Sequence, residues 1–196
     1  MSFLKISNVS LIVFIIIAVF FKPAFAYNIG NAGAGIKIVE YSDYECPYCR
    51  KFELKTFPYI YKNYIKRGYI DWDFRDYPLV NIHAFAYKAA VIADCSGNDY
   101  MAVRYYLFKY QDEWRKTGDI YETLKSFVNT NTIKTCVNTL YSKKIVNKDL
   151  RQAYRLGLRA TPSFVIYKNG KYLQIIKGYH NSGFWYFTLN FLLTEK

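Results

Sequence analysis

The residues best suited to chemistry are two cysteines, Cys46 and Cys49, which are separated by a proline and a tyrosine. The pair follows an apolar run and precedes a helical pattern, so we expect Cys46 at the N-terminus of a helix. Backbone N–H groups and the helix dipole stabilise a thiolate at that end. Cys49 would lie one turn further along, within the about 7 Å between Cα atoms that a disulfide requires. The spacing predicts thiol–disulfide exchange, with Cys46 as the nucleophile that forms a mixed disulfide and Cys49 as the resolving thiol.

A structural disulfide and half of a zinc site are the alternatives for this pair. A zinc site would need two further ligands nearby. The other cysteines, Cys95 and Cys136, are remote in the sequence, and the two histidines, His83 and His180, stand alone. We therefore predict no bound metal and no other cofactor.

The first 26 residues have the pattern of a secretory signal peptide. Lys5 gives a positive start, residues 11–21 are uniformly apolar, and Ala24-Phe25-Ala26 offers a cleavage site. The apolar run is shorter than the about 20 residues that span a bilayer. We predict cleavage after Ala26 and export to an oxidising compartment, where disulfide chemistry takes place. The alternative is an uncleaved segment that tethers the protein to the membrane.

The chain has a formal net charge of +12, and 52% of its residues are apolar, which excludes disorder. Strong basicity can indicate nucleic acid or an anionic membrane as a partner. Here lysine, asparagine, isoleucine and tyrosine are frequent along the whole chain, and no run of five or more basic residues occurs. Together with export, this distribution predicts no binding of nucleic acid.

The elements that must position the two thiols follow from hydrophobic periodicity and turn residues. Residues 27–35 are glycine-rich and are expected to form a flexible lead-in. Pro58 should kink or break the first helix, and Asn169-Gly170 is a strong hairpin signal. The predicted elements, in order, are a strand at 36–42, a helix at 47–66, a strand at 69–75, several helices between 83 and 156, strands at 164–167 and 171–177, and a helix at 184–193.

Four stretches in this order resemble the DsbA-like branch of the thioredoxin superfamily. They are IVEYSDYECPYCRKF at the thiol pair, FRDYPL followed by AYKAAVIADC, LFKYQDEW, and LGLRATPSFVIYKNG. The resemblance implies an α/β fold, a thioredoxin fold with a helical domain inserted after the second strand of the motif. The thioredoxin-fold domain would comprise residues 36–80 and 157–196, and the inserted helical domain residues 81–156.

The resemblance also implies roles for residues around the thiol pair. Pro162 would be a cis-proline beside the cysteines, and the backbone of Thr161 would pair with an extended substrate chain. The alternative is an ordinary proline at the start of a strand. Glu40 would be a buried acid beneath the cysteines that accepts the proton of the resolving thiol. The alternative there is an exposed strand carboxylate.

Pro47 and Tyr48, between the cysteines, would tune the stability of the thiolate and hence the redox potential. Strongly oxidising members of the resembled family often carry histidine in place of Tyr48. No such imidazole is therefore expected to pair with the Cys46 thiolate. His83 is expected to cap or pack at the first inserted helix.

Cys95 and Cys136 fall within the helical segment. Two cysteines in an oxidising compartment are more often paired than free, and the resembled family also has cysteines at these places. We predict a structural disulfide that stabilises the domain by roughly 4 kcal/mol in the chain-entropy model. A second redox relay is the alternative.

The resemblance implies a periplasmic oxidoreductase that donates the Cys46–Cys49 disulfide to folding exported proteins and is reoxidised by a membrane quinone-linked protein. A reductase or isomerase in the same compartment is the first alternative. Isomerases of this superfamily usually dimerise through an extra N-terminal domain, for which residues 27–35 are too few, so a monomer is expected. The alternative of another class is a non-catalytic module that binds peptides or metal through the thioredoxin groove.

Overall fold

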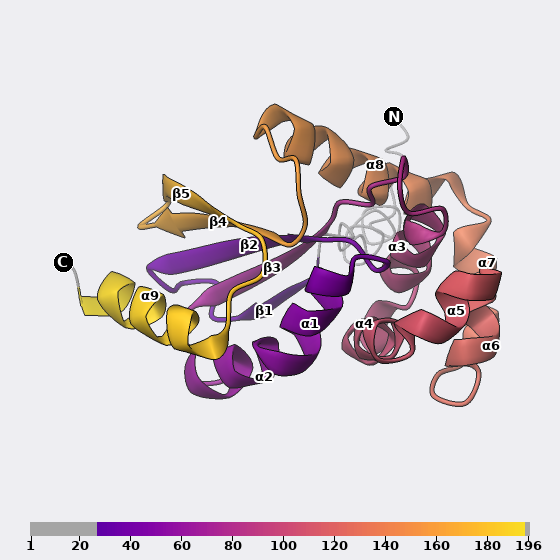
Figure 1. Ribbon diagram of the computed structural model, residues 1–196, viewed down its shortest axis with the longest axis horizontal. Helices are drawn as coiled ribbons and strands as arrows, with labels where there is room; N and C mark the ends of the chain where they lie inside the picture. The colour runs from indigo at the N-terminus through magenta and orange to yellow at the C-terminus, as the bar shows by residue number, and fades with distance from the viewer. Residues whose placement is uncertain (1–26, 195–196) are drawn as a thin grey trace, which may run out of the picture.

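The computed structural model describes residues 27–194 (Figure 1). The predicted signal peptide lies outside the described residues. Among the helices of residues 27–194, none is both long enough and apolar enough to cross a membrane.

One mixed sheet forms the centre of the molecule. Its strands are β1 (Asn28–Gly30), β2 (Ile36–Ser42), β3 (Asp71–Asp76), β4 (Ser163–Lys168) and β5 (Lys171–Lys177), in the spatial order β1-β3-β2-β4-β5. β2 and β3 run parallel, and the other neighbouring pairs are antiparallel. Because β2 and β3 are parallel, their carboxyl ends lie at the same edge of the sheet, and the thiol pair follows β2 at this edge.

Helices cover both faces of the sheet (Figure 1). α1 (Pro47–Lys55) and α9 (Ser182–Thr194) lie on one face, and α8 (Leu140–Arg155) lies on the other. The first face carries an aromatic cluster whose ring centroids are 4.7 to 6.1 Å apart. The cluster consists of Phe52 of α1, Trp72 of β3, Phe164 of β4 and Trp185 of α9. It fixes α1, and with it the thiol pair, against the central strands.

The helix predicted at 47–66 is divided into three parts. α1 is followed by α2 (Phe57–Ile60) and by a π-helical turn, η2 (Tyr61–Ile65). We predicted the break at Pro58, and the structure places it two residues earlier, at Thr56. Pro58 lies in the first turn of α2, where its missing N–H costs no hydrogen bond.

A run of helices connects β3 to β4 and lies beside the sheet before α8 returns across it (Figure 1). The run comprises α3 (Ala86–Asp94), the 3-10 turn η3 (Gly97–Asp99), α4 (Tyr100–Lys109), α5 (Gln111–Thr117), α6 (Ile120–Leu124), α7 (Thr130–Val137) and α8. The predicted order, a β-α-β unit, helices inserted after its second strand, then a hairpin and a helix, is confirmed.

The glycine-rich segment differs from the prediction of a flexible lead-in at 27–35. Three of its residues form β1, which pairs with β3 at the edge of the sheet. Tyr27, directly before β1, stacks on Tyr100 of α4 with ring centroids 4.4 Å apart. Both contacts are made with residues far along the chain. The glycine-rich composition alone therefore predicts a loop and does not reveal the strand.

The hairpin predicted at Asn169-Gly170 is confirmed. The two residues have φ angles of 51° and 76°. Positive φ at both central positions is the requirement of a type I′ turn, which asparagine and glycine meet at the lowest steric cost. The turn joins β4 to β5 and so sets the register of the strand that follows Pro162.

Candidate active site

Cys46 lies at the start of α1, as the residue that precedes the first helical position, and Pro47 occupies that position. Both thiols of the pair are free and buried in this structure. In its protonated form the Cys46 thiol donates a hydrogen bond to the Thr161 carbonyl oxygen, with 3.4 Å between sulfur and oxygen. A hydrogen bond from Cys49, with smaller contributions from the backbone N–H groups of Cys49 and Tyr48, lowers the pKa of Cys46 to about 6, although burial opposes this shift. Cys46 is therefore ionised at neutral pH.

Cys49 has the opposite electrostatic environment. Burial raises the pKa of its thiol well above the usual value, and the neighbouring Cys46 raises it further. The backbone N–H of Asp43 donates to the Cys49 sulfur at 3.5 Å. The site thus holds one thiolate and one thiol at neutral pH, an arrangement suited to directional attack by Cys46.

The loop before β4 forms the second wall of the site. The Thr161–Pro162 peptide bond is cis, and both residues are buried. The Thr161 carbonyl points to Cys46, while the Pro162 carbonyl accepts a hydrogen bond from Gly178 at the end of β5. The structure thus brings Thr161 and Pro162 next to Cys46, although they are far apart in the sequence.

Glu40 is fully buried beneath α1, on the strand that leads into the thiol pair. Its carboxylate accepts hydrogen bonds from Arg104 Nη2 at 2.6 Å, from Trp72 Nε1 at 3.1 Å and from the Ser42 hydroxyl. The alternative of an exposed carboxylate is therefore wrong. No hydrogen bond joins Glu40 to either thiol among the described residues.

Glu53 and Arg104 are polar residues of this region that the sequence analysis missed. Arg104 Nε lies 2.8 Å from Glu53 Oε2, so one guanidinium joins two buried carboxylates, those of Glu40 and Glu53. Burial raises the pKa of Glu53 to about 7, against the attraction of Arg104. The available signal was the spacing on α1: Glu53 comes four residues after Cys49 and so shares its face of the helix.

The inserted helices hold the start of α1 from the outside. Gln111 Nε2 of α5 donates to the carbonyl oxygens of Tyr44 and Cys46 at 2.7 and 3.1 Å. Arg50 of α1 pairs with Asp112 of the same inserted helix at 2.5 Å. Tyr48, between the cysteines, is 60% exposed and lies free at the surface. α5 therefore fixes the backbone of the site and leaves Pro47 and Tyr48, between the cysteines, open to a partner.

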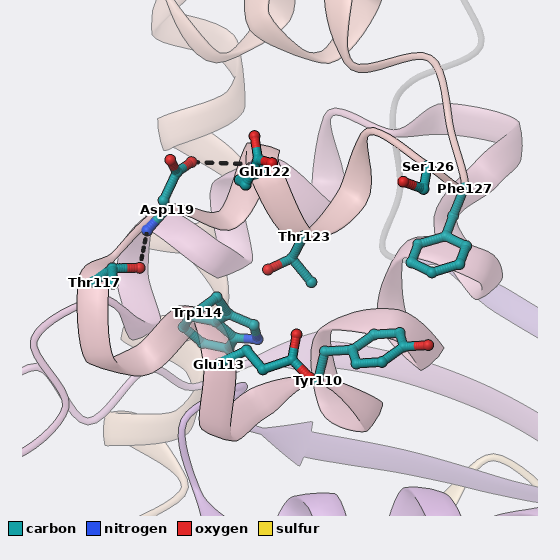
Figure 2. A pocket seen from close by; sticks show the side chains of 9 residues that line it. All are labelled: Tyr110, Glu113, Trp114, Thr117, Asp119, Glu122, Thr123, Ser126 and Phe127. Carbon is teal, nitrogen blue, oxygen red and sulfur yellow. Dashed lines mark hydrogen bonds between the residues drawn. The ribbon is translucent and has the colours of Figure 1, made fainter.

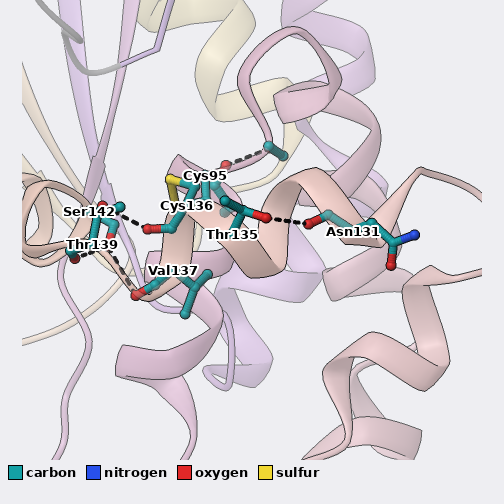
Figure 3. The surroundings of a disulfide bond; sticks show 9 residues. Cys95, Asn131, Thr135, Cys136, Val137, Thr139 and Ser142 are labelled. Atoms are coloured by element: carbon teal, nitrogen blue, oxygen red, sulfur yellow. Dashed lines mark hydrogen bonds between the residues drawn. A yellow bond between two sulfur atoms is a disulfide. The ribbon is translucent and has the colours of Figure 1, made fainter.

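Cys95 and Cys136 form a disulfide in the structure (Figure 3), with an S–S length of 2.05 Å and Cα atoms 5.6 Å apart. It joins the end of α3 to α7, two elements that do not carry the thiol pair. The Thr139 hydroxyl donates to the Cys136 carbonyl and helps to end α7.

Two cavities lie away from the two thiols. A cavity of about 540 Å³ between α5 and α6 is lined by Trp114, Tyr110 and Phe127 together with acidic and hydroxyl side chains (Figure 2). A second cavity of about 380 Å³ is apolar and includes Glu53 in its lining. In the part of the chain that the structure describes, no cluster of three or more histidine, cysteine, aspartate or glutamate side chains is arranged to hold a metal ion.

The sequence and the fold of this chain are both similar to those of known proteins. A family model described as thioredoxin matches residues 26–175. The chain is 28% identical over 159 residues to a probable disulfide bond formation protein D of Bacillus cereus, covering 74% of this chain and 73% of that protein. It is 26% identical over 162 residues to disulfide bond formation protein D of Bacillus subtilis, covering 77% and 71%.

Among solved structures, the fold is similar to that of alpha-DsbA1 of Wolbachia pipientis. The TM-score is 0.74 at 26% sequence identity, and the match covers 86% of this chain and 90% of that one. These likenesses confirm the predicted fold class, a thioredoxin fold with an inserted helical region.

Proposed function

Because this chain belongs to the thioredoxin family and is a DsbA-like thiol:disulfide oxidoreductase, we propose that it is exported to the periplasm and donates its Cys46–Cys49 disulfide to secreted proteins as they fold. The observation that carries the proposal is the contrast between the two thiols. The pKa of Cys46 is lowered to about 6, and that of buried Cys49 is raised. A stabilised Cys46 thiolate favours the reduced form of the pair, which makes the disulfide a better oxidant.

In the proposed cycle a substrate thiolate attacks Sγ of Cys46 in the oxidised enzyme. The Cys46–Cys49 bond breaks, its electron pair leaves on Cys49, which takes up a proton, and the substrate becomes bonded to Cys46. A second substrate thiolate then attacks the substrate sulfur of this mixed disulfide and expels the Cys46 thiolate. The substrate loses two electrons and gains a disulfide. The low pKa of Cys46 favours the second step, because thiols of low pKa leave faster.

Thr161 and Pro162 are proposed to bind the substrate chain. An extended segment that pairs with the Thr161 backbone would run beside Cys46, because the Thr161 carbonyl oxygen lies 3.4 Å from the Cys46 sulfur. Exposed Pro47 and Tyr48 would border that segment and tune the thiolate.

Glu40 is proposed to accept and return the proton of Cys49, in concert with Glu53. Arg104 binds both carboxylates, and the pKa of Glu53, about 7, suits proton exchange at neutral pH. The cavity that Glu53 lines would connect this pair of acids to solvent.

The remaining parts of the proposal concern the other disulfide and the partners. We assign the Cys95–Cys136 disulfide a structural role, since it joins α3 and α7 away from the elements that bear the thiol pair. A membrane quinone-linked protein would reoxidise Cys46 and Cys49, and the enzyme would act as a monomer.

Trapping of mixed disulfides tests the proposal. In a Cys49→Ala variant of the full chain, produced in a bacterium and exported, Cys46 can form mixed disulfides that the enzyme's own second thiol can no longer displace, so they last longer. We expect adducts with exported proteins on non-reducing gels, identified by mass spectrometry, and none with the Cys46→Ala control. Equal adducts with Cys46→Ala would contradict the assignment of the nucleophile, and no adducts in either variant would support a non-catalytic module.

A further inference from the structure

The turn between β2 and α1 places two acidic side chains directly before the reactive thiol. Asp43 and Glu45 precede Cys46 by three residues and by one, and both are almost fully buried. A carboxylate close to a thiol disfavours the thiolate, and burial strengthens the effect. A positive charge beside this acidic turn would offset its effect on the Cys46 thiolate.

His83, from the loop between β3 and α3, lies against that turn. Its Nδ1 is 2.8 Å from Asp43 Oδ2, and the two side chains are 12% and 0% exposed. In the described part of the chain, no lysine or arginine lies within ion-pair distance of Asp43 or Glu45. His83 is thus the basic side chain that meets the acidic turn.

The loop that carries His83 is held to the acidic turn by two further hydrogen bonds. The Leu79 N–H donates to Asp43 Oδ2 at 2.7 Å, and the Phe85 N–H donates to the Glu45 carboxylate at 2.5 Å. Because backbone groups on both sides of His83 are bound, the imidazole is kept in place against Asp43.

Asp43 in turn contacts both thiol-bearing residues through its backbone. Its carbonyl oxygen accepts from the Cys46 N–H at 3.1 Å, and its N–H donates to the Cys49 sulfur at 3.5 Å. The position of the Asp43 backbone therefore acts directly on the thiol pair.

We propose that His83 is a positioning residue of the exchange reaction: its imidazolium acts as the counter-charge of Asp43 and Glu45 and thereby stabilises the Cys46 thiolate. This inference rests on the proposed function in one respect, that Cys46 is the exchanging thiol. Position 48 carries tyrosine, so an imidazole from the loop after β3 supplies the positive charge that the residues between the cysteines lack. His83 does more than the helix capping or packing expected of it from the sequence.

The protonation of His83 agrees with this role. The hydrogen bond to Asp43 raises the pKa of the imidazole, partial burial opposes it, and the charges of Asp43, Cys46 and Glu45 raise it further. The coupling between two charges is reciprocal. If the Cys46 thiolate raises the pKa of His83, the imidazolium must stabilise the thiolate by the same free energy, and only below the pKa of His83.

A His83→Asn variant separates the charge from the hydrogen bond. The asparagine amide can still donate to Asp43, so the loop keeps its anchor while the positive charge is lost. His180→Asn is the matched control, because the other histidine is bound to the Lys177 carbonyl and stacked on Phe184. The absorbance of the thiolate at 240 nm, followed against pH in the reduced full-length protein, reports on Cys46, and a Cys46→Ser variant identifies its step.

We expect His83→Asn to raise the midpoint of Cys46 ionisation by roughly one pH unit and His180→Asn to leave it unchanged. In the unaltered protein, NMR titration should give a higher pKa for His83 in the reduced form than in the disulfide form. An unchanged Cys46 midpoint in His83→Asn, or the same His83 pKa in both redox forms, would overturn the proposal. If the low-pH step survives in Cys46→Ser, the assignment of the nucleophile fails and this inference fails with it.

Discussion

At the scale of single residues, the chemistry depends on the different surroundings of two sulfur atoms that are one helical turn apart. The hydrogen bond from Cys49 and the N–H groups at the start of α1 favour the thiolate of Cys46. Cys49 lies deeper, and its burial keeps the proton on the thiol. If both thiols were buried as Cys49 is, the pair would hold no thiolate at neutral pH to act as the nucleophile.

This difference predicts the pH dependence of alkylation. The rate at which iodoacetamide modifies Cys46 in the reduced protein should rise with pH, with a midpoint at about 6, because only the thiolate reacts. Below the midpoint the rate should fall tenfold per pH unit. Cys49→Ala removes the hydrogen bond that contributes most to the lowering of the pKa, so its midpoint should lie at higher pH. Mass spectrometry measures both rates.

A midpoint close to about 8.5, the value of an unperturbed thiol, would show that the helix start does not stabilise the Cys46 thiolate. The disulfide-bonded Cys95 and Cys136 provide an internal control, since they should remain unmodified at every pH.

At the residue scale, the sequence predicts the reactive groups better than their partners. Cys46, Cys49 and Pro162 follow from a local motif and from a family resemblance. The contacts of Asp43 with His83 and of Glu40 with Arg104 join residues 40 and 64 positions apart. Arginine is mostly exposed and histidine has only intermediate burial, so a single sequence gives no reason to place Arg104 and His83 next to the site.

At the scale of elements, the inserted helices hold the β2–α1 unit from two sides. α4 reaches the interior through Arg104, which binds Glu40 of β2 and Glu53 of α1. α5 holds the backbone at the start of α1 through Gln111. The insertion therefore positions the thiol pair as well as enlarging the surface.

Arg104 should be essential for stability. Arg104→Met leaves two buried carboxylates without their cation, and we expect the free energy of unfolding to fall by about 3 kcal/mol. Arg50→Ala breaks the exposed pair with Asp112 and should lower it by less than about 1 kcal/mol. Urea unfolding of the two variants measures both values. Equal losses of unfolding free energy would contradict a stabilising role for the buried network of Arg104, Glu40 and Glu53.

The elements themselves were largely predictable. β2, the hairpin at Asn169-Gly170 and the start of α1 at Pro47 follow from apolar runs and turn residues. β1 was not predictable, because its strand pairing depends on β3 and its neighbour Tyr27 on Tyr100. The division of the first long helix was predicted only approximately, since Pro58 lies in the first turn of the second part rather than at the end of the first.

At the scale of the whole molecule, three parts of the chain meet at one edge of the sheet. Cys46 comes from the N-terminal β-α-β unit, Thr161 from the loop before the C-terminal hairpin, and His83 from the segment after β3 that leads into the inserted helices. α8 then crosses the opposite face of the sheet and returns the chain to the hairpin (Figure 1). The exposed Tyr48 leaves this edge accessible to a partner chain.

The most direct test of the central claim, that the Cys46–Cys49 disulfide is donated to other proteins, is the reduction potential of the pair in a glutathione redox titration of the purified protein. We predict a potential less negative than about −180 mV, toward the about −120 mV of a strong oxidant, because the stabilised Cys46 thiolate favours the reduced form. A potential near about −270 mV would contradict the account and identify the protein as a reductase.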